Sequence, residues 1–265
     1  MSRLSLQGKT LVIIGGTSGI GYSAARAFIA AGAQIVAVGL DSAKASAAEK
    51  SLGHAAHIIQ GDARNSETAE RAIREAIAAF DGFHGLYHVA GGSGREWGDG
   101  PLHEISDSGW DETIKLNMTS MMYSNRAAVR QFQEQQTGGS ILNISSVLGF
   151  SPSPHYFATH AYAAAKAAVI GFTKALAAYY APSNIRFNVL APALIETPMS
   201  QRSVNSREIV EFIETKQPLD GGRVGQPSDL DAAAVYFMSD DSKFTTGQVM
   251  AIDGGWCISE GQYKQ

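Results

Sequence analysis

The sequence predicts an α/β protein: a single doubly wound, Rossmann-type domain over residues 1–265, with a seven-stranded parallel sheet flanked by helices. Short β-branched runs alternate with longer helical stretches along the chain. Helices that connect successive strands in this way imply parallel strands with right-handed connections. The strand runs are almost continuously apolar, as in a sheet covered on both faces. No internal repeat or low-complexity linker interrupts the pattern, so we expect one domain.

Each element follows from a local pattern. The apolar run Leu11–Ile14 predicts a strand, and the helical stretch Ile20–Ala31 after it is closed by Gly32. An alanine-rich helix is expected from about Ser42, and Ser66–Phe80 carries apolar residues at the spacing of one buried helix face. The seven expected strands are Leu11–Ile14, Ile35–Val38, Ala56–Gln60, Leu86–Val89, Ser140–Ile144, Ile185–Leu190 and Val249–Ile252.

The composition is that of an ordinary globular protein, with 45% hydrophobic and 17% charged residues. A net charge of -4 gives no electrostatic basis for binding nucleic acid or an anionic membrane surface. Cys257 is the only cysteine, which excludes an intrachain disulfide and fits a reducing compartment. Met1–Gly16 has too short an apolar run for a signal peptide, and no segment has the length of a membrane span. We therefore expect a cytoplasmic protein.

Two glycine-rich loops follow the carboxyl ends of expected strands. Gly91–Gly100 follows the fourth strand, and residues 193–225 follow the sixth. Ligands bind at this edge of open α/β sheets, and we expect the second loop to contact the substrate.

The segment Gly15–Gly21 reads G-x-x-x-G-x-G between the first strand and its helix. Glycines there let the backbone approach a pyrophosphate, and the helix amino terminus offers free N–H groups and a positive dipole end. A plain tight turn is the alternative, but the strand before and the helix after favour a phosphate site.

Tyr162 and Lys166 are four residues apart, so on a helix their side chains share one face. A tyrosine with a pKa of about 10 must lose about three units to act as a base near neutrality. An ammonium about 5 Å away supplies roughly 3 kcal/mol of the roughly 4 kcal/mol required. The pair therefore suits proton transfer, although a core tyrosine beside a solvated lysine would give the same pattern.

Ser145 and Ser146 end the fifth expected strand. A hydroxyl there can donate to a substrate carbonyl oxygen and stabilise the charge that grows as hydride arrives. Capping of the strand end is the alternative for both serines.

Taken together, these motifs resemble those of the short-chain dehydrogenase/reductase family, in its shorter single-domain branch. The resemblance runs from Gly8 to about Cys257. It rests on the glycine motif at 15–21, Asp62, Ala90-Gly91, Asn117, Ile144-Ser145-Ser146, Tyr162 with Lys166, Asn188 to Pro192, Thr197-Pro198, Gly247-Gln248 and Asp253-Gly254-Gly255.

The resemblance implies reversible hydride transfer between a nicotinamide cofactor and a secondary alcohol or ketone. The resemblance implies that Tyr162 is the general acid/base. Lys166 would lower the pKa of Tyr162 and hydrogen-bond to the nicotinamide ribose, and Ser146 would hold the substrate oxygen. Asn117 would anchor a water that links Lys166 to solvent. The implied cofactor-binding residues are Gly15, Thr17, Ser18, Gly19, Ile20, Gly21, Leu40, Asp41, Asp62, Ala63, Ala90, Gly91, Tyr162, Lys166, Pro192, Ile195 and Thr197.

The chain departs from the family pattern at three places. Ile14 stands where threonine is usual, His88-Val89 replace the asparagines before Ala90-Gly91, and Ala193 replaces a glycine. No catalytic group is lost, but the hydrogen bonds that fix the fourth strand come into doubt. The stretch from Ser146 to Tyr162 is also longer than in many relatives, which suggests a distinct substrate loop.

The end of the second strand bears on the choice of cofactor. Gly39 stands where a ribose-binding aspartate is common, and Leu40 where NADP enzymes often carry arginine. Asp41 would repel a 2′-phosphate, and Lys44 is the one nearby cation. The sequence therefore favours NAD over NADP.

Three residues of the loops are candidates to line the substrate pocket: Arg95, which could bind a carboxylate, Trp97 and His155. The alternatives are a solvated side chain, which is favoured for Arg95, and ordinary loop packing for His155. His84 and His88 flank a strand, so their side chains do not converge, and we expect no metal site.

The helix expected over Ala161–Ala181 has Lys166 and Lys174 as its only charges. A helix apolar on nearly all sides is buried on all sides, so we expect a subunit interface there, and the resemblance points to a homotetramer.

A catalytically silent nucleotide-binding regulator or scaffold is the alternative function. A sugar-nucleotide epimerase or dehydratase is disfavoured because the chain leaves no room for a second domain.

Overall fold

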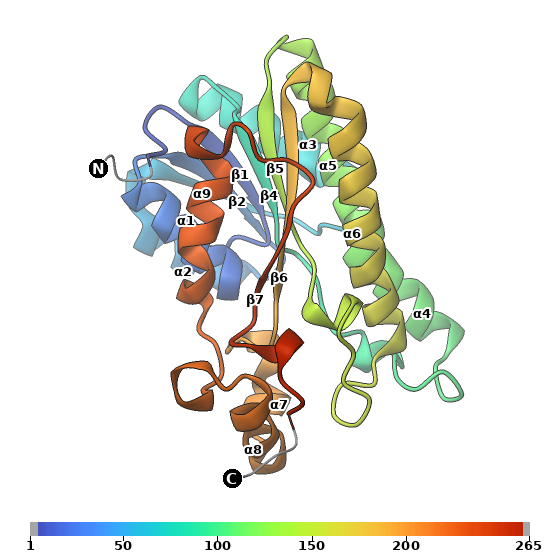
Figure 1. Cartoon of the computed structure of the whole chain (residues 1–265). Helices are drawn as coiled ribbons and strands as arrows, with labels where there is room; N and C mark the ends of the chain where they lie inside the picture. The colour runs from blue at the N-terminus through green and yellow to red at the C-terminus, as the bar shows by residue number, and fades with distance from the viewer. Residues whose placement is uncertain (1–4, 262–265) are drawn as a thin grey trace.

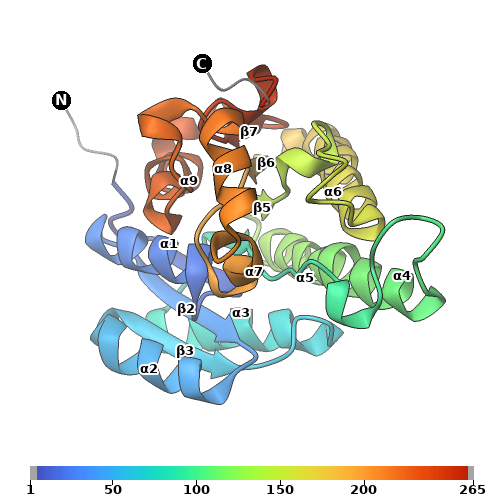
Figure 2. The same cartoon turned by 90° about the horizontal axis from the view of Figure 1, so that it is seen from below.

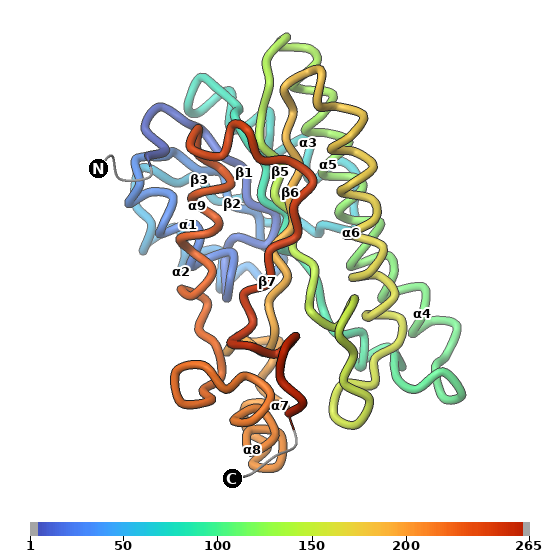
Figure 3. Tube along the Cα trace, in the orientation of Figure 1, coloured from blue at the N-terminus to red at the C-terminus, as the bar shows by residue number. Residues whose placement is uncertain are grey.

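A computed structural model describes residues 5–261; residues 1–4 and 262–265, which the expected domain includes, lie outside the described part. All seven expected strands are present in one parallel sheet, in the order β3-β2-β1-β4-β5-β6-β7. The predicted fold class is therefore confirmed (Figures 1 and 3). The strands are β1 Thr10–Ile14, β2 Gln34–Gly39, β3 Ala56–Gln60, β4 Gly85–His88, β5 Gly139–Ile144, β6 Ile185–Pro192 and β7 Val249–Ile252.

Helices cover both faces of the sheet, α1, α2 and α9 on one and α3, α5 and α6 on the other (Figures 1 and 2). Several begin at a polar residue that accepts a backbone N–H, such as Asp41 before α2 and Asn65 before α3. The helices are α1 Gly19–Ala30, α2 Ser42–Leu52, α3 Ser66–Phe80, α4 Asp107–Ile114, α5 Ser120–Glu134, α6 His160–Tyr180, α7 Gln201–Val204, α8 Arg207–Lys216 and α9 Asp231–Met238.

The core forms two layers because alternate strand residues point to opposite faces. Along β1, Leu11 and Ile13 pack in one layer with Phe28 of α1. Val12 and Ile14 pack in the other, with residues of α3 and α5. Both faces of the sheet are therefore shielded from water, which explains the continuous apolar runs of the strands.

The chain reverses its direction of travel across the sheet between β1 and β4, which are neighbours in the sheet. Ligands bind at such a switch point, beyond the carboxyl ends of the strands. The short helices α7 and α8 lie at this end of the molecule and stand in the foreground when it is seen from below (Figure 2).

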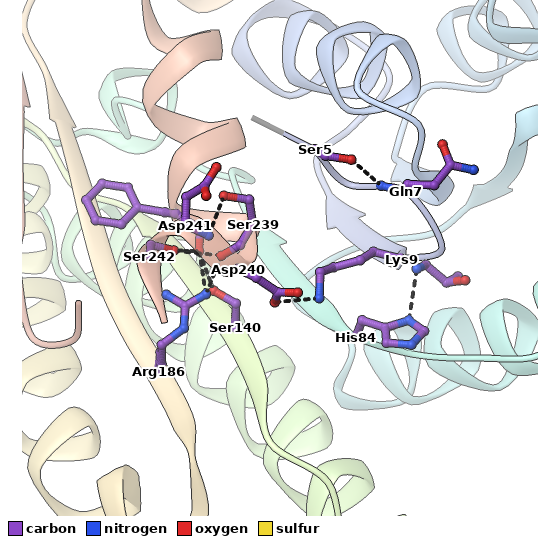
Figure 4. Close-up of polar contacts among 12 residues, drawn as sticks. Ser5, Gln7, Lys9, His84, Ser140, Arg186, Ser239, Asp240, Asp241 and Ser242 are labelled. Carbon is purple, nitrogen blue, oxygen red and sulfur yellow. Dashed lines mark hydrogen bonds and ion pairs between the residues drawn. The ribbon is translucent and has the colours of Figure 1, made fainter. Parts of the chain in front are cut away.

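A polar network fixes the opposite, amino-terminal edge (Figure 4). Lys9 is paired with Asp240 at 2.7 Å, and this hydrogen bond lowers the pKa of the Asp240 carboxyl. The imidazole of His84 accepts the backbone N–H of Thr10 at 2.9 Å. Arg186 donates to carbonyl oxygens at the end of α9, so charged groups here have structural partners.

Candidate active site

The loop between β1 and α1 packs directly against the backbone of neighbouring segments. Gly15 has a φ of +90°, and a Cβ there would lie 2.7 Å from the backbone nitrogen of Ala90. A Cβ at Gly21 would lie 2.1 Å from the carbonyl oxygen of Gly15. Only glycine fits these positions. The loop thus brings free N–H groups at the start of α1 to the edge of the sheet, a cradle that fits a pyrophosphate.

A cleft of about 500 Å³ opens beside this loop. It contains most of the residues expected to bind the cofactor, namely Gly15, Thr17, Ser18, Gly19, Ile20, Leu40, Asp41, Asp62, Ala63, Ala90, Gly91 and Thr197. The residues Lys44, Arg64, Leu116 and Met199 also line it. The shape and the glycine-lined wall fit a dinucleotide.

Five expected cofactor residues do not line the cleft, namely Gly21, Tyr162, Lys166, Pro192 and Ile195. Gly21 is packed behind Gly15. Pro192 is buried at the end of β6, and the side chain of Ile195 points into the core. Contacts from Gly21, Pro192 and Ile195 to a cofactor would have to come from their backbone or from neighbours.

Asp62 is held in place by charge at the rim of the cleft. Arg64 binds its carboxylate at 2.8 Å and reaches Glu112 at 3.1 Å. The hydrogen bond from Arg64 lowers the pKa of Asp62. The arginine is thus committed to two carboxylates, and its guanidinium lies 5.8 Å from the centre of the Trp97 ring.

A second cavity, of about 440 Å³, adjoins the first, because Glu96, Trp97 and Met199 line both. Ser146 and Tyr162 form part of its wall. The two cavities meet, as a cofactor site and a substrate site must.

Tyr162, Ser146 and Lys166 are brought together by β5 and α6. Tyr162 and Ser146 line the same cavity, and Lys166 Nζ lies 5.4 Å from the centre of the Tyr162 ring. Lys166 donates to the carbonyl of Ile144 at 3.1 Å. Ser145 points elsewhere and donates to the backbone carbonyl of Lys166 at 2.7 Å, so it ties the strand to the helix.

Burial dominates the proton affinities of this group. It raises the pKa of Tyr162 to about 12, against a smaller lowering by the Ser146 hydrogen bond. It also lowers the pKa of Lys166 to about 8. The expected lowering of the Tyr162 pKa by Lys166 is therefore not found in the chain alone, because burial disfavours both charges.

Asn117 lies in a π-helical turn, Lys115–Thr119, between α4 and α5. Its amide donates to the carbonyls of Gly92 and Thr113 at 2.8 and 2.9 Å, and its oxygen accepts the N–H of Gly92 at 3.2 Å. A Cβ on Gly91 would lie 2.8 Å from Asn117 Oδ1 and 3.3 Å from Lys166 Nζ. Asn117 therefore fixes the loop after β4 close to Lys166.

Asp99 is a site residue that the sequence did not reveal. Its two carboxylate oxygens accept the backbone N–H groups of Ala161 and Tyr162, both at 3.0 Å, and the side chain is buried. A carboxylate at a helix amino terminus satisfies free donors and complements the helix dipole. Asp99 thereby links the loop after β4 to the first turn of α6, where Tyr162 lies.

His88 replaces the usual asparagine without loss of order. It is buried between two serines of α5, Nδ1 at 2.8 Å from Ser124 Oγ and Nε2 at 3.3 Å from Ser120 Oγ. Burial, followed by the charge of Lys166, lowers the pKa of His88 to about 3. A neutral imidazole therefore ties β4 to α5.

The structure separates the three residues expected to line the substrate pocket. Arg95 and Trp97 line the second cavity. His155 is exposed, lies edge-on to Tyr156 with 4.6 Å between the ring centres, and does not line either cavity. Arg202 and Trp256 line the cavity although no local pattern in the sequence pointed to them.

Two absences hold for residues 5–261. No helix there is both long and apolar enough to cross a membrane. In the same residues, no group of three or more His, Cys, Asp or Glu side chains could hold a metal ion.

Comparison with known proteins places this geometry in context. A family model described as enoyl-(acyl carrier protein) reductase matches residues 15–257. The chain is 33% identical over 256 residues to 3beta-hydroxysteroid dehydrogenase 2 of Eggerthella lenta, covering 95% of each chain. It is 33% identical over 254 residues to 3-oxoacyl-(acyl-carrier-protein) reductase FabG of Chlamydia trachomatis, covering 94% of this chain and 98% of the other.

A solved structure has the same fold. The chain superposes on a short-chain type dehydrogenase/reductase from Mycobacterium ulcerans with a TM-score of 0.87 and 30% identity, covering 96% of this chain and 92% of that one.

Proposed function

Because this chain belongs to the short-chain dehydrogenase/reductase family and is a nicotinamide-dependent oxidoreductase of alcohol and keto groups, we propose that Tyr162, Ser146, Lys166 and Asn117 are its catalytic group. The position of Tyr162 and Ser146 in the wall of the second cavity, with Lys166 Nζ 5.4 Å from the centre of the Tyr162 ring, carries this proposal. A catalytically silent scaffold gains no support, since Tyr162 and Ser146 line the second cavity and Lys166 Nζ and Asn117 Oδ1 lie beside Gly91, which lines the first.

The residues of the first cleft fit a nicotinamide dinucleotide. Gly15 and Gly19 with the amino terminus of α1 would hold the pyrophosphate, and Asp62 would face the adenine. When bound, the nicotinamide accepts a hydride from the carbinol carbon or returns it to the ketone.

Ser146 and Tyr162 would hold the substrate oxygen between their hydroxyl groups. In reduction the Tyr162 hydroxyl donates its proton to that oxygen, and its raised pKa keeps the proton available at neutral pH. In oxidation the phenol oxygen accepts the proton of the alcohol.

Lys166, with a pKa lowered to about 8, can take up or release a proton close to neutrality. Its Nζ lies beside Gly91 and Asn117. We assign these residues the passage of the proton between Tyr162 and solvent.

We propose NAD as the preferred cofactor. A side chain at position 39 would collide with Thr17, whose Oγ1 would lie 1.9 Å from a Cβ there. Among the described residues the cations lining the cleft are Lys44 and Arg64, and Arg64 is bound to Asp62 and Glu112. Lys44 is thus the one cation left for a 2′-phosphate, and Asp41 stands beside it.

Turnover of a panel of secondary alcohols and ketones with NAD(H) and NADP(H) tests the proposal, with wild type beside Tyr162→Phe. We expect the substitution to lower kcat by about 100-fold or more, since proton transfer commonly contributes this much. Cofactor titration by fluorescence should remain normal. Equal turnover in the variant would remove Tyr162 from its role.

We also propose a cytoplasmic homotetramer of one domain per chain. The single sheet takes strands from Thr10 to Ile252, which supports one folding unit, and the free Cys257 fits a reducing compartment. One face of α6 remains exposed and consists mainly of small residues, among them Ala164, Ala168, Gly171 and Ala175. Such a face permits close packing of a helix from another copy.

A further inference from the structure

Two arginines line the second cavity without an acidic partner, and we propose that they bind a carboxylate of the substrate. This inference rests on the proposed function, in which Tyr162 reacts with a substrate in the same cavity. It makes the substrate a hydroxy acid or oxo acid whose reacting carbon lies apart from its carboxylate.

The two arginines come from different loops at the carboxyl edge of the sheet. Arg95 lies in the loop after β4, and Arg202 lies in α7, after β6. Their Nη2 atoms donate to the same oxygen, the carbonyl of Tyr156, at 3.4 and 3.2 Å. The two nitrogens can therefore be no farther apart than those two distances combined.

Within residues 5–261 no carboxylate forms an ion pair with either arginine within 4.0 Å. The nearby carboxylate of Asp99 has both oxygens bonded to α6, and Glu96, in the cavity wall, makes no ion pair with either arginine. Burial and then the charge of Arg202 lower the pKa of Arg95, with a smaller opposing effect of Asp99.

A planar carboxylate suits this arrangement. Guanidinium groups present forked N–H donors that match two carboxylate oxygens. Each arginine has five such donors, and the described contacts use few of them. An anion there would replace like-charge repulsion with two charged hydrogen-bonding partners.

The remaining residues that line the second cavity indicate how polar the carbon skeleton of the substrate can be. Apart from the arginines and the catalytic residues, much of the cavity is formed by the apolar side chains of Val147, Leu148, Phe157, Leu194, Met199 and Trp256. These surroundings favour an apolar carbon skeleton. The cavity thus selects an apolar oxo acid over a polyhydroxylated sugar.

The test compares oxo acids of graded chain length, with alkyl or phenyl bodies, with the methyl ester of each. Wild type, Arg95→Gln, Arg202→Gln and the double variant are assayed with both members of each pair. Arg207→Gln is the matched control, because Arg207 is an exposed arginine of the neighbouring helix α8, paired with Glu211.

We expect wild type to prefer at least one acid over its ester by 10-fold or more in kcat/KM. Each cavity substitution should lower kcat/KM for that acid by about 10- to 100-fold, mainly through KM, because the carboxylate is bound equally in ground and transition states. The ester should be affected little, and the control should match wild type with both.

Equal use of acids and esters by wild type would overturn the inference, as would an unchanged acid-to-ester ratio in the double variant. Where turnover is too slow to compare, binding of the same pairs to the enzyme with NAD, followed by fluorescence of Trp97 and Trp256, must show the same preference. Tyr162→Phe separates the two proposals. Unchanged turnover in that variant contradicts the proposed function, whereas lost turnover with no acid preference in wild type contradicts only the carboxylate site.

Discussion

At the scale of single residues, burial shifts the pKa values of several groups away from their values in water. Tyr162 keeps its proton, Lys166 gives its proton up more easily, and His88 remains neutral, all mainly because burial disfavours charge. Because burial outweighs the smaller lowering by Ser146, this leaves a neutral proton donor facing the second cavity.

His88 makes a testable contribution to acid stability. Its pKa falls from 6.5 in the unfolded chain to about 3 in the folded one, so below pH 6.5 the unfolded state binds more protons. The free energy of unfolding should therefore decrease as the pH falls from 6.5 towards 3. Urea unfolding across this range measures the decrease.

The matched variant is His88→Asn, which carries the residue usual in relatives. It should lose less stability than wild type between pH 6.5 and 3, whatever its stability at pH 7. Parallel pH profiles for the two proteins would contradict a buried neutral imidazole.

The sequence identified the polar residues whose neighbours lie close in the chain. Tyr162 and Lys166 could be paired because helical spacing places them on one face. The glycines at 15–21 could be recognised because the whole motif lies within a few consecutive residues. Asp99 could not be found this way, since it acts on N–H groups 62 and 63 positions later. Arg202 joins Arg95 only because two separate loops meet above the sheet.

At the scale of elements, the strand positions followed closely from apolar runs, because strands buried on both faces have little choice of residue. The observed strands begin or end up to two residues from the expected ones, as β6 does by extending to Pro192. The short helices α7 and α8 were not placed in advance. Their residues pack on the site rather than on the sheet, so no long periodic pattern marks them.

Helix α6 depends on a cap from another part of the chain. We expect Asp99→Ala to lower the free energy of unfolding by about 1–2 kcal/mol, the usual cost of losing an N-cap. We also expect kcat to fall more than KM rises, because the first turn of α6 carries Tyr162. Steady-state kinetics and urea unfolding measure the two effects.

Two comparisons distinguish positioning from simple destabilisation. Asp99→Asn keeps one acceptor oxygen and should restore part of kcat. Asn65→Ala removes the cap of α3 and should lower stability without lowering kcat. A kcat equal to wild type in Asp99→Ala would show that the cap does not position Tyr162.

At the scale of the whole molecule, the exposed small-residue face of α6 bears on assembly. Gly171 lies in this face, and a Cβ added there meets no atom of its own chain within 4 Å. Gly171→Glu should therefore leave the subunit folded while placing a charge in the proposed interface. Light scattering should show the mass falling from about four subunits towards the 28.1 kDa of one chain.

Ala78→Glu, on the exposed side of α3, serves as the control and should leave the mass unchanged. A wild-type monomer at micromolar concentration would contradict the tetramer directly. A Gly171→Glu variant that remained tetrameric would place the interface elsewhere.

The loop from Gly91 to Gly100 serves three neighbours at once: Gly91 borders the cofactor cleft, Arg95 the substrate cavity, and Asp99 the first turn of α6. Under the proposed function, its two ends would be held by the cofactor and by α6, whereas its middle would border the substrate. New substrate preferences could arise in evolution through changes at Ser93 to Trp97 alone. A library that varies Ser93, Arg95, Glu96 and Trp97 but keeps Gly94, where a Cβ would lie 1.8 Å from Thr113 Oγ1, would be an economical route to redirecting this enzyme.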